Sequence, residues 1–194
     1  MRLIAPGNRN NLRKYFYKNC LKDDFEKIGN IDLLDDLSNE NLQNAINKRR
    51  SIRAFLNEEI SKEDFLFITK DIFKFTKKYN IDIFFTNNNI KDMKKGLYKN
   101  NSLLKEGDFN KEMTVLGLNQ KLSGQSAFTF IFTSNSCENY FYTYILSGFI
   151  AQILYLRTSC INLSCSGIGA YFDDETKEFL DTKNNILYFF AIGK

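Results

Sequence analysis

Apolar residues recur at helical spacing in several parts of the chain, most clearly over residues 61–79. Ser61 and Asp64 form the pattern of a capping box, which marks where a helix begins. The apolar positions that follow lie three or four residues apart, as on the buried face of an amphipathic helix: Phe65, Ile68, Ile72 and Phe75. We therefore predict a single helix here, with this stripe facing the core.

Other helices are predicted from the same spacing and from end signals. They are expected at residues 38–47, 108–124 and 138–163. Ser38 is the expected N-cap of the first, and Asp108 begins the second. The third is the longest and the most apolar. A glycine turn followed by a short acidic helix is expected within residues 165–180.

Runs of β-branched and aromatic residues predict the strands. They cover residues 81–87, 126–134 and 185–194. Residues 96–107, GLYKNNSLLKEG, have the pattern of a short hairpin. Because helices and strands alternate irregularly, and not as regular βαβ units, we expect an α+β fold with a mixed sheet. We expect one domain over residues 34–194, preceded by an N-terminal extension, residues 1–33.

The composition limits the classes of protein to consider. The 194 residues are 43% hydrophobic, which is enough for one core. The net charge is only +4 and the pI is about 8.7, so nucleic-acid binding is not favoured. The first residues lack the apolar run of a signal peptide, and we expect a cytoplasmic protein.

One uncharged stretch, residues 140–156, resembles a membrane span. It contains the polar residues Thr143, Ser147 and Gln152 and lies between polar segments. A helix buried in the core or at a subunit interface is therefore favoured over a membrane helix.

The absence of histidine excludes several kinds of active site. Neither a Ser-His-Asp or Cys-His nucleophilic site nor a histidine-ligated metal can be built from this chain. The cysteines show no CxxC spacing, so a zinc site is not expected and buried free thiols are favoured: Cys20, Cys137, Cys160 and Cys165. An enzyme of this sequence must use other side chains for proton transfer, or depend on a cofactor.

The most basic stretch is KRRSIRAF, residues 48–55. Arg49, Ser51 and Arg53 alternate, so on an extended segment all three point to one side and can meet one phosphate group, while Arg50 points away. Two other interpretations stand beside this one. Basic side chains also suit the negative end of a helix dipole, and short basic runs also occur in targeting or nucleic-acid patches.

A second candidate is SGIGAYFDDE, residues 166–175. Gly167 and Gly169 allow a flat ligand to approach the backbone closely. The stretch is not a GxGxxG dinucleotide fingerprint, because Tyr171 and Phe172 stand where the third glycine would be. A tight turn between two elements is the alternative interpretation.

Five motifs follow one another in a characteristic order. They are RRSxRxF, AFTFIFT, GxxAQxxYL inside the long helix, IGAYFDDE, and the closing LYFFAIGK. Over residues 40–194 this series resembles the nitroreductase superfamily of FMN-dependent oxidoreductases. Residues 96–134 are more specifically similar to the SagB-type dehydrogenases, which oxidise thiazolines and oxazolines during peptide maturation.

The resemblance implies a three-layer fold and a homodimer. A mainly antiparallel sheet would be flanked by helices, with the long central helix and the FMN at the subunit interface. Ser147, Gly148 and Ala151 place small residues on that helix, which would let a partner helix approach closely. The same residues would equally serve packing within one chain.

The resemblance also assigns roles to the basic stretch. Arg49 and Ser51 match the residues that hold the FMN phosphate and ribityl chain, and Arg50 is a weaker phosphate candidate. Arg53 matches the basic residue near flavin N1 and O2, where a cation stabilises the negative charge of reduced flavin.

Other cofactor residues are implied further along the chain. Gly167, Ile168 and Gly169 match the loop that lies along the isoalloxazine ring. Lys194 matches a basic residue that reaches the phosphate, and Gln120 matches a recurrent glutamine.

The sequence departs from the azoline-oxidising members at their catalytic pair. Ser134 and Asn135 stand where those proteins have Lys-Tyr, and Phe149 stands where they commonly have histidine. Tyr140 and Tyr142 are the candidates to replace a proton donor, although half-buried helix tyrosines are common without such a role.

Three functions follow from these observations. The first is an FMN-dependent oxidoreductase that transfers hydride between substrate and flavin N5, acting as a SagB-like dehydrogenase on a ribosomally made peptide together with maturation-complex proteins. The second is an NAD(P)H-dependent reductase of nitro or quinone compounds. The third is a catalytically degenerate scaffold subunit. A basic nucleic-acid module is the weakest alternative, and no membrane partner is expected.

Overall fold

The centre of the molecule is a six-stranded sheet. The computed structural model describes residues 33–135 and 140–194. The strands are β1 (Ile81–Asn87), β2 (Gly96–Lys99), β3 (Ser102–Glu106), β4 (Phe128–Ser134), β5 (Ser164–Ile168) and β6 (Asn185–Gly193). Their order is β3-β2-β1-β4-β6-β5, and each neighbouring pair is antiparallel. The predicted strands and the predicted hairpin of β2 and β3 are all present.

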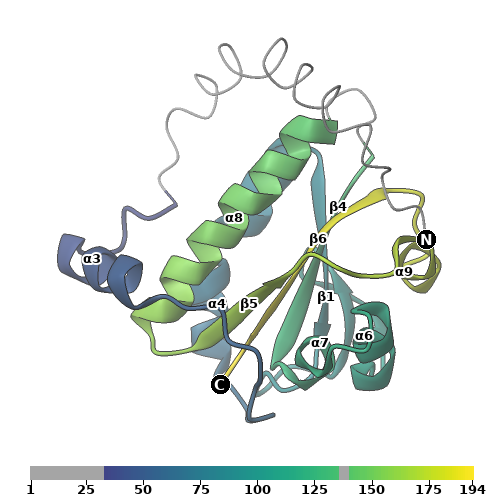
Figure 1. Ribbon diagram of the computed structural model, residues 1–194, viewed down its shortest axis with the longest axis horizontal. Coiled ribbons are helices and arrows are strands. Elements are labelled where there is room, and N and C mark those ends of the chain that lie inside the picture. Colours follow the sequence, from purple (N-terminus) through teal and green to yellow (C-terminus); the bar gives the residue numbers. More distant parts are fainter. Residues whose placement is uncertain (1–32, 136–139) are drawn as a thin grey trace.

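Helices cover both faces of this sheet, as Figure 1 shows. They are α3 (Asn39–Lys48), α4 (Lys62–Thr69), α5 (Ile72–Lys78), α6 (Asn110–Leu116), α7 (Lys121–Gln125), α8 (Tyr140–Cys160) and α9 (Asp173–Phe179). Residues of α4, α5 and α8 share one apolar cluster with the sheet, and residues of α6 and α7 share a second cluster on its other face, against which α9 packs. The predicted α+β fold with three layers is confirmed.

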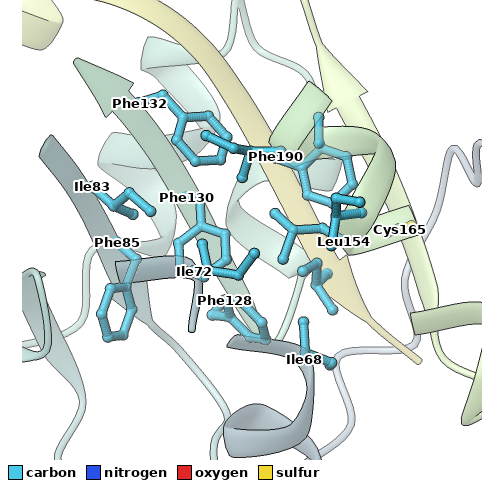
Figure 2. Close-up of a cluster of buried hydrophobic side chains, with 14 of the residues drawn as sticks. Ile68, Ile72, Ile83, Phe85, Phe128, Phe130, Phe132, Leu154, Cys165 and Phe190 are labelled. Atoms are coloured by element: carbon cyan, nitrogen blue, oxygen red, sulfur yellow. The ribbon is translucent and has the colours of Figure 1, made fainter. Parts of the chain in front are cut away.

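The central strands are apolar on both sides because both sides are covered. In β4, Phe130 and Phe132 point toward the α8 layer and Ile131 toward the α6 layer, and all three are fully buried. Figure 2 shows the larger cluster, in which Ile72 and Leu154 pack onto the phenylalanines of β4. Each buried side chain of this size contributes roughly 1.5–3 kcal/mol by leaving water.

The single helix predicted over residues 61–79 is wrong, because the chain forms two helices there. The capping box at Ser61 and Asp64 is present and begins α4. Helix α4 ends before Lys70, and Asp71 adopts a left-handed conformation with φ of 61° before α5 begins. The apolar stripe continues across this break, with Ile68 and Ile72 both fully buried, so its spacing gives no sign of the break.

The helix predicted over residues 108–124 is likewise divided in two. Asp108 accepts a hydrogen bond from the Asn110 backbone nitrogen at the start of α6, at 2.9 Å. Leu118 and Asn119 then have φ of 55° and 59°, which no α-helix accommodates, and α7 begins only at Lys121. Gly117, just before them, ends α6.

The glycine stretch expected as a turn is the edge strand β5. Gly167 lies opposite Phe190 of β6 in the ladder. A side chain at Gly167 would collide with the hydroxyl of Tyr188, so glycine is needed here for packing. The acidic helix predicted after it is present as α9.

The long apolar helix α8 belongs to the core. Leu146, Ile150 and Leu154 are fully buried against the sheet. Among the described residues, no helix combines the length and apolar character that crossing a membrane requires. The predicted start of this helix, at residues 138 and 139, lies outside the described residues.

A buried arginine at the end of α8 connects three parts of the chain. Arg157 is 1% exposed, and its guanidinium donates to the carbonyl oxygens of Leu33 at 2.7 Å and Phe67 at 2.6 Å. It also pairs with the Asp36 carboxylate at 2.8 Å, which Lys70 contacts from the solvent side at 3.0 Å. Most of the predicted N-terminal extension, residues 1–32, lies outside the described residues, but its junction with the domain is held by this cation.

The Asp36 carboxylate is kept charged by its neighbours. Its partial burial acts to raise its pKa, but the hydrogen bond from Lys70 and the charges of Arg157 and Lys70 prevail and hold the pKa below its ordinary value. The stabilisation from this group is therefore present above the pKa of an unfolded aspartate and is lost as the pH falls through the folded value.

Replacing Arg157 by methionine tests how much this junction depends on the buried cation. Arg157→Met removes the donor to two carbonyl groups, so the free energy of unfolding should fall by about 3–5 kcal/mol in urea denaturation. The control, Lys70→Met, removes a cation that is 52% exposed and should cost at most about 1 kcal/mol. Equal losses for the two variants would contradict the role given to Arg157. The difference in the free energy of unfolding between Arg157→Met and wild type should also become smaller in acid, because Asp36 is then protonated.

One glycine substitution tests the packing of β5, and a second, in α8, is its contrast. Gly167→Ala forces a methyl group against Tyr188 and should lower the free energy of unfolding by about 1–3 kcal/mol. Gly148, in the middle of α8, has open space within the single chain, with nothing within 4 Å of an added methyl group, so Gly148→Ala should raise the stability of the monomer by about 0.5–1 kcal/mol at protein concentrations too low for association. Thermal unfolding measures both, and a shift of the same sign in both variants would contradict these packing roles.

Candidate functional site

The basic stretch leaves α3 and runs along the outer edge of β5. Arg49 ends α3 with an extended ψ of 128°. Ser51 then forms an isolated parallel bridge with Cys165 of β5, where the Ile52 backbone nitrogen donates to the Cys165 carbonyl at 3.1 Å. We call residues 49–53 the basic segment. It is extended at Arg49 and pairs with β5 at Ser51, and it bends at Arg53.

A tyrosine from α8 connects the basic segment to β5. Tyr155 is 8% exposed, and its hydroxyl lies 2.7 Å from the Ser51 hydroxyl. The Gly167 backbone N–H donates to the same tyrosine oxygen at 2.9 Å. The Arg49 guanidinium lies over the tyrosine ring, 4.9 Å from its centre. Arg49, Ser51, Tyr155 and Gly167 form what we call the Tyr155 cluster.

The end of the chain lies beside the same segment. Gly193 pairs with Ser164 across β6 and β5, and the Leu56 backbone nitrogen donates to the Lys194 carbonyl at 2.8 Å. The Lys194 ammonium is 3.8 Å from the Glu58 carboxylate, but both side chains are about half exposed, so this pair contributes little and does not hold the lysine in place.

The remaining arginines of the basic segment differ from each other. Arg50 folds back, and its guanidinium donates to the carbonyl oxygens of Asn47 at 3.1 Å and of Arg49 at 2.8 Å. These are carbonyls at the C-terminal end of α3, so the helix-end interpretation describes Arg50. Arg53 is exposed, two residues beyond Ser51 along the segment.

The chain just after β5 contacts Gln120, which is distant in sequence. The Gln120 side-chain amide donates to the Ala170 carbonyl at 3.4 Å, next to Gly169. Gly169 is exposed, and a side chain there would meet nothing within 4 Å. Ile168 is 2% exposed and its side chain packs in the cluster beneath α6 and α7, so it can offer a ligand only its backbone.

The candidate tyrosines lie elsewhere on α8. Tyr142 packs edge-on against Tyr79, with ring centres 6.2 Å apart. It precedes Tyr155 by 13 positions, which corresponds to about 20 Å along the helix axis. The structure therefore does not bring Tyr142 to the Tyr155 cluster. The side chain of Tyr140 lies outside the described residues.

The groups behind the Tyr155 cluster carry no negative charge at neutral pH. Burial raises the pKa of the Cys165 thiol to about 12, against the opposing effects of a Thr158 hydroxyl at 3.1 Å and the charge of Arg49. Burial also raises the pKa of Tyr188. Cys165 is a buried free thiol as predicted, and Cys160 is a partly exposed one. The charge in the cluster is thus that of Arg49 alone, which suits an anion.

The donor set and the open surface fit a flat molecule that carries a phosphate. Arg49 and Ser51 offer a guanidinium and a hydroxyl, and Gly169, just after the end of β5, leaves open space beside the backbone. Arginine and hydroxyl donors are the groups that bind phosphate oxygens in proteins. Sequence reasoning missed Tyr155 as a member of this site, although it stands inside the GxxAQxxYL motif of the long helix.

Comparisons with known proteins agree on the architecture. No family model matches the chain. A protein from Methanocaldococcus jannaschii named as a nitroreductase is 20% identical over 187 residues, covering 83% of this chain and 94% of its own length. An Anabaena variabilis structure, also named as a nitroreductase, superposes with a TM-score of 0.65 at 22% identity over 79% of this chain. The NfrA1 nitroreductase of Bacillus subtilis gives 0.60 at 18% identity over 78%.

The lengths of these proteins differ. The chain spans only 38% of the Anabaena structure and 65% of NfrA1. More than three quarters of this chain nevertheless superposes on each of them. The chain therefore adopts the nitroreductase fold.

Proposed function

We propose that the chain is an FMN-dependent oxidoreductase of the nitroreductase kind. The observation that carries this proposal is the meeting of Arg49, Ser51 and Gly167 around Tyr155 in a chain with the nitroreductase fold. These three residues come from two motifs more than a hundred positions apart, and each was expected to touch the same ligand. When bound, FMN would supply hydride transfer at its N5 atom.

Each candidate residue has a distinct part in holding FMN. Arg49 and Ser51 would bind the phosphate, and Lys194, whose backbone lies against Leu56, would add a cation from the chain end. Arg53 would lie near the N1 and O2 atoms and favour the negative charge that develops there. Gly169 would let the ring approach the backbone, with Gln120 beside it, whereas the Tyr188 hydroxyl already fills the space over Gly167. Arg50 is left out of this set, because it is engaged with α3.

On the substrate side we propose reduction of nitro or quinone compounds with NADH or NADPH. The Methanocaldococcus and Bacillus proteins are named as nitroreductases, and one further structural match is named an NADH oxidase from Clostridium acetobutylicum. SagB-like oxidation of an azoline peptide has less support, since Ser134 and Asn135 replace its Lys-Tyr pair. That same absence favours the scaffold hypothesis, which remains the alternative if turnover is lacking.

A homodimer formed through α8 is part of the proposal. Ser147 and Ala151 are buried within the chain, at 2% and 3% exposure, so they already serve internal packing. Gly148 is exposed with open space around it, and Tyr144 and Gln152 flank it one helical turn away on each side. This stripe is where we expect a partner helix.

The proposal is tested first by the visible spectrum of the purified protein and by FMN titration. Wild type should bind FMN, and Arg49→Ala/Arg53→Ala should weaken binding by on the order of a hundredfold, because it removes charge-assisted hydrogen bonds. Arg50→Ala is the matched control within the same segment and should bind as wild type does. A colourless wild type that FMN cannot reconstitute would overturn the proposal.

Turnover separates the substrate classes once FMN binding is established. Under anaerobic conditions, oxidation of NADH or NADPH that depends on an added nitroarene or quinone is the expected result. In a separate aerobic assay, in which oxygen reoxidises the reduced flavin, oxidation of an azoline peptide without nicotinamide would replace the reductase with the SagB-like dehydrogenase. A flavin-loaded protein inactive in both assays would favour the scaffold.

A further inference from the structure

We propose that Tyr155 is a positioning residue that sets Ser51 and Arg49 to bind the phosphate of FMN. The inference rests on the proposed function and adds a residue that the sequence patterns had not indicated. Two features of the Tyr155 side chain support it: the hydrogen bonds of its hydroxyl and the fixed position of its ring.

The hydroxyl of Tyr155 can transmit a hydrogen-bond direction to Ser51. The Gly167 backbone N–H can only donate, so the tyrosine oxygen accepts there, at 2.9 Å. The Ser51 and Tyr155 hydroxyl oxygens lie 2.7 Å apart, where either can donate, and the proposal assigns the donated hydrogen to Tyr155. Ser51 then keeps its own hydrogen for an acceptor outside the chain. A phosphate oxygen on that serine would polarise and strengthen the series Gly167, Tyr155, Ser51.

The ring of Tyr155 gives Arg49 a rigid base. The ring packs edge-on against Phe190, with centres 4.9 Å apart and planes at 90°, and only 8% of the residue is exposed. The Arg49 guanidinium carbon lies over this ring, 4.9 Å from its centre, so the aromatic face attracts the cation. This contact needs no conventional hydrogen bond from the guanidinium, so its N–H donors stay available for phosphate oxygens.

The arrangement predicts an effect limited to the phosphate. Riboflavin has the same ring system and ribityl chain as FMN but no phosphate. A tyrosine that only supports the core should, when changed, affect the binding of both ligands equally. A tyrosine that directs Ser51 and Arg49 should affect FMN and leave riboflavin unchanged.

The test uses the full chain stripped of flavin, with Kd values for FMN and riboflavin measured by quenching of flavin fluorescence. Tyr155→Phe keeps the ring and removes the hydroxyl. We expect about a five- to tenfold weaker Kd for FMN, the size of one hydrogen bond, and an unchanged Kd for riboflavin. Tyr98→Phe is the control, since it removes a hydroxyl that donates to the Lys94 carbonyl at 2.8 Å near the opposite end of the sheet, and both Kd values should stay as in wild type.

A double variant tests whether the tyrosine acts through the serine. Ser51→Ala should weaken FMN binding by itself, and adding Tyr155→Phe to it should cause little further loss, because the transmitted hydrogen bond is already gone. Fully additive losses would contradict the series from Gly167 to Ser51.

The outcomes separate this inference from the function on which it rests. If wild type binds neither flavin, the proposed function fails. If wild type binds FMN and Tyr155→Phe binds it equally well, only the role of Tyr155 is overturned. Equal weakening of FMN and riboflavin would likewise overturn it, in favour of a purely structural tyrosine.

Discussion

The covering of one apolar sheet on both faces is the constraint on which the rest of the structure depends. Strands β1, β4 and β6 carry apolar side chains on both sides, so neither face can meet water. Helix α8 covers much of one face with Leu146, Ile150 and Leu154. Since the helix is fixed by this packing, the position of Tyr155 one residue later is fixed as well. The candidate site is therefore an extension of the core, where the last buried turns of α8 reach the edge of the sheet at β5.

Much of the fold follows from patterns that depend on local chemistry. Strands β1, β4 and β6 are runs of aromatic and branched residues that only a covered sheet can bury, and the capping box at Ser61 is a short-range hydrogen-bond pattern. The two wrong helices have a common physical cause. Asp71, Leu118 and Asn119 all adopt positive φ, and Asp and Asn are only moderately more common there than other residues, so the local signal for each break is weak. Gly117 is a further signal at the second break, but the spacing of the apolar residues outweighed it. Strand β5 was missed because Gly167 favours a turn locally, while its pairing with β6 and the hydroxyl of Tyr188 are tertiary effects.

The candidate site shows the same division between local and distant effects. The alternation of Arg49, Ser51 and Arg53 places the three side chains on one side only where the backbone is extended, which the sequence could not establish. The resemblance to a known motif assigned Arg49 and Ser51 to a phosphate. No sequence pattern indicates that Arg50 turns back onto α3, because this depends on where that helix ends. Nor could spacing reveal Tyr155, because it joins Ser51 across 104 positions of the chain. Tyr142 was chosen for its closeness to a motif in sequence, and the rise of the helix separates it from the cluster.

Among the described strands, β5 has only one neighbour in the sheet, β6, and we expect the basic segment to protect its outer edge from association. The outer edge of a terminal strand offers backbone groups that can pair with another molecule. Here the Ile52 backbone N–H donates to the Cys165 carbonyl, and the Gly167 backbone N–H donates to the Tyr155 hydroxyl. At the opposite edge, β3 consists of exposed residues and includes the charged Lys105 and Glu106. The contacts that would receive an anionic ligand are thus also those that keep β5 from joining a strand of a second chain, so damage to the basic segment would promote intermolecular association as well as loss of ligand.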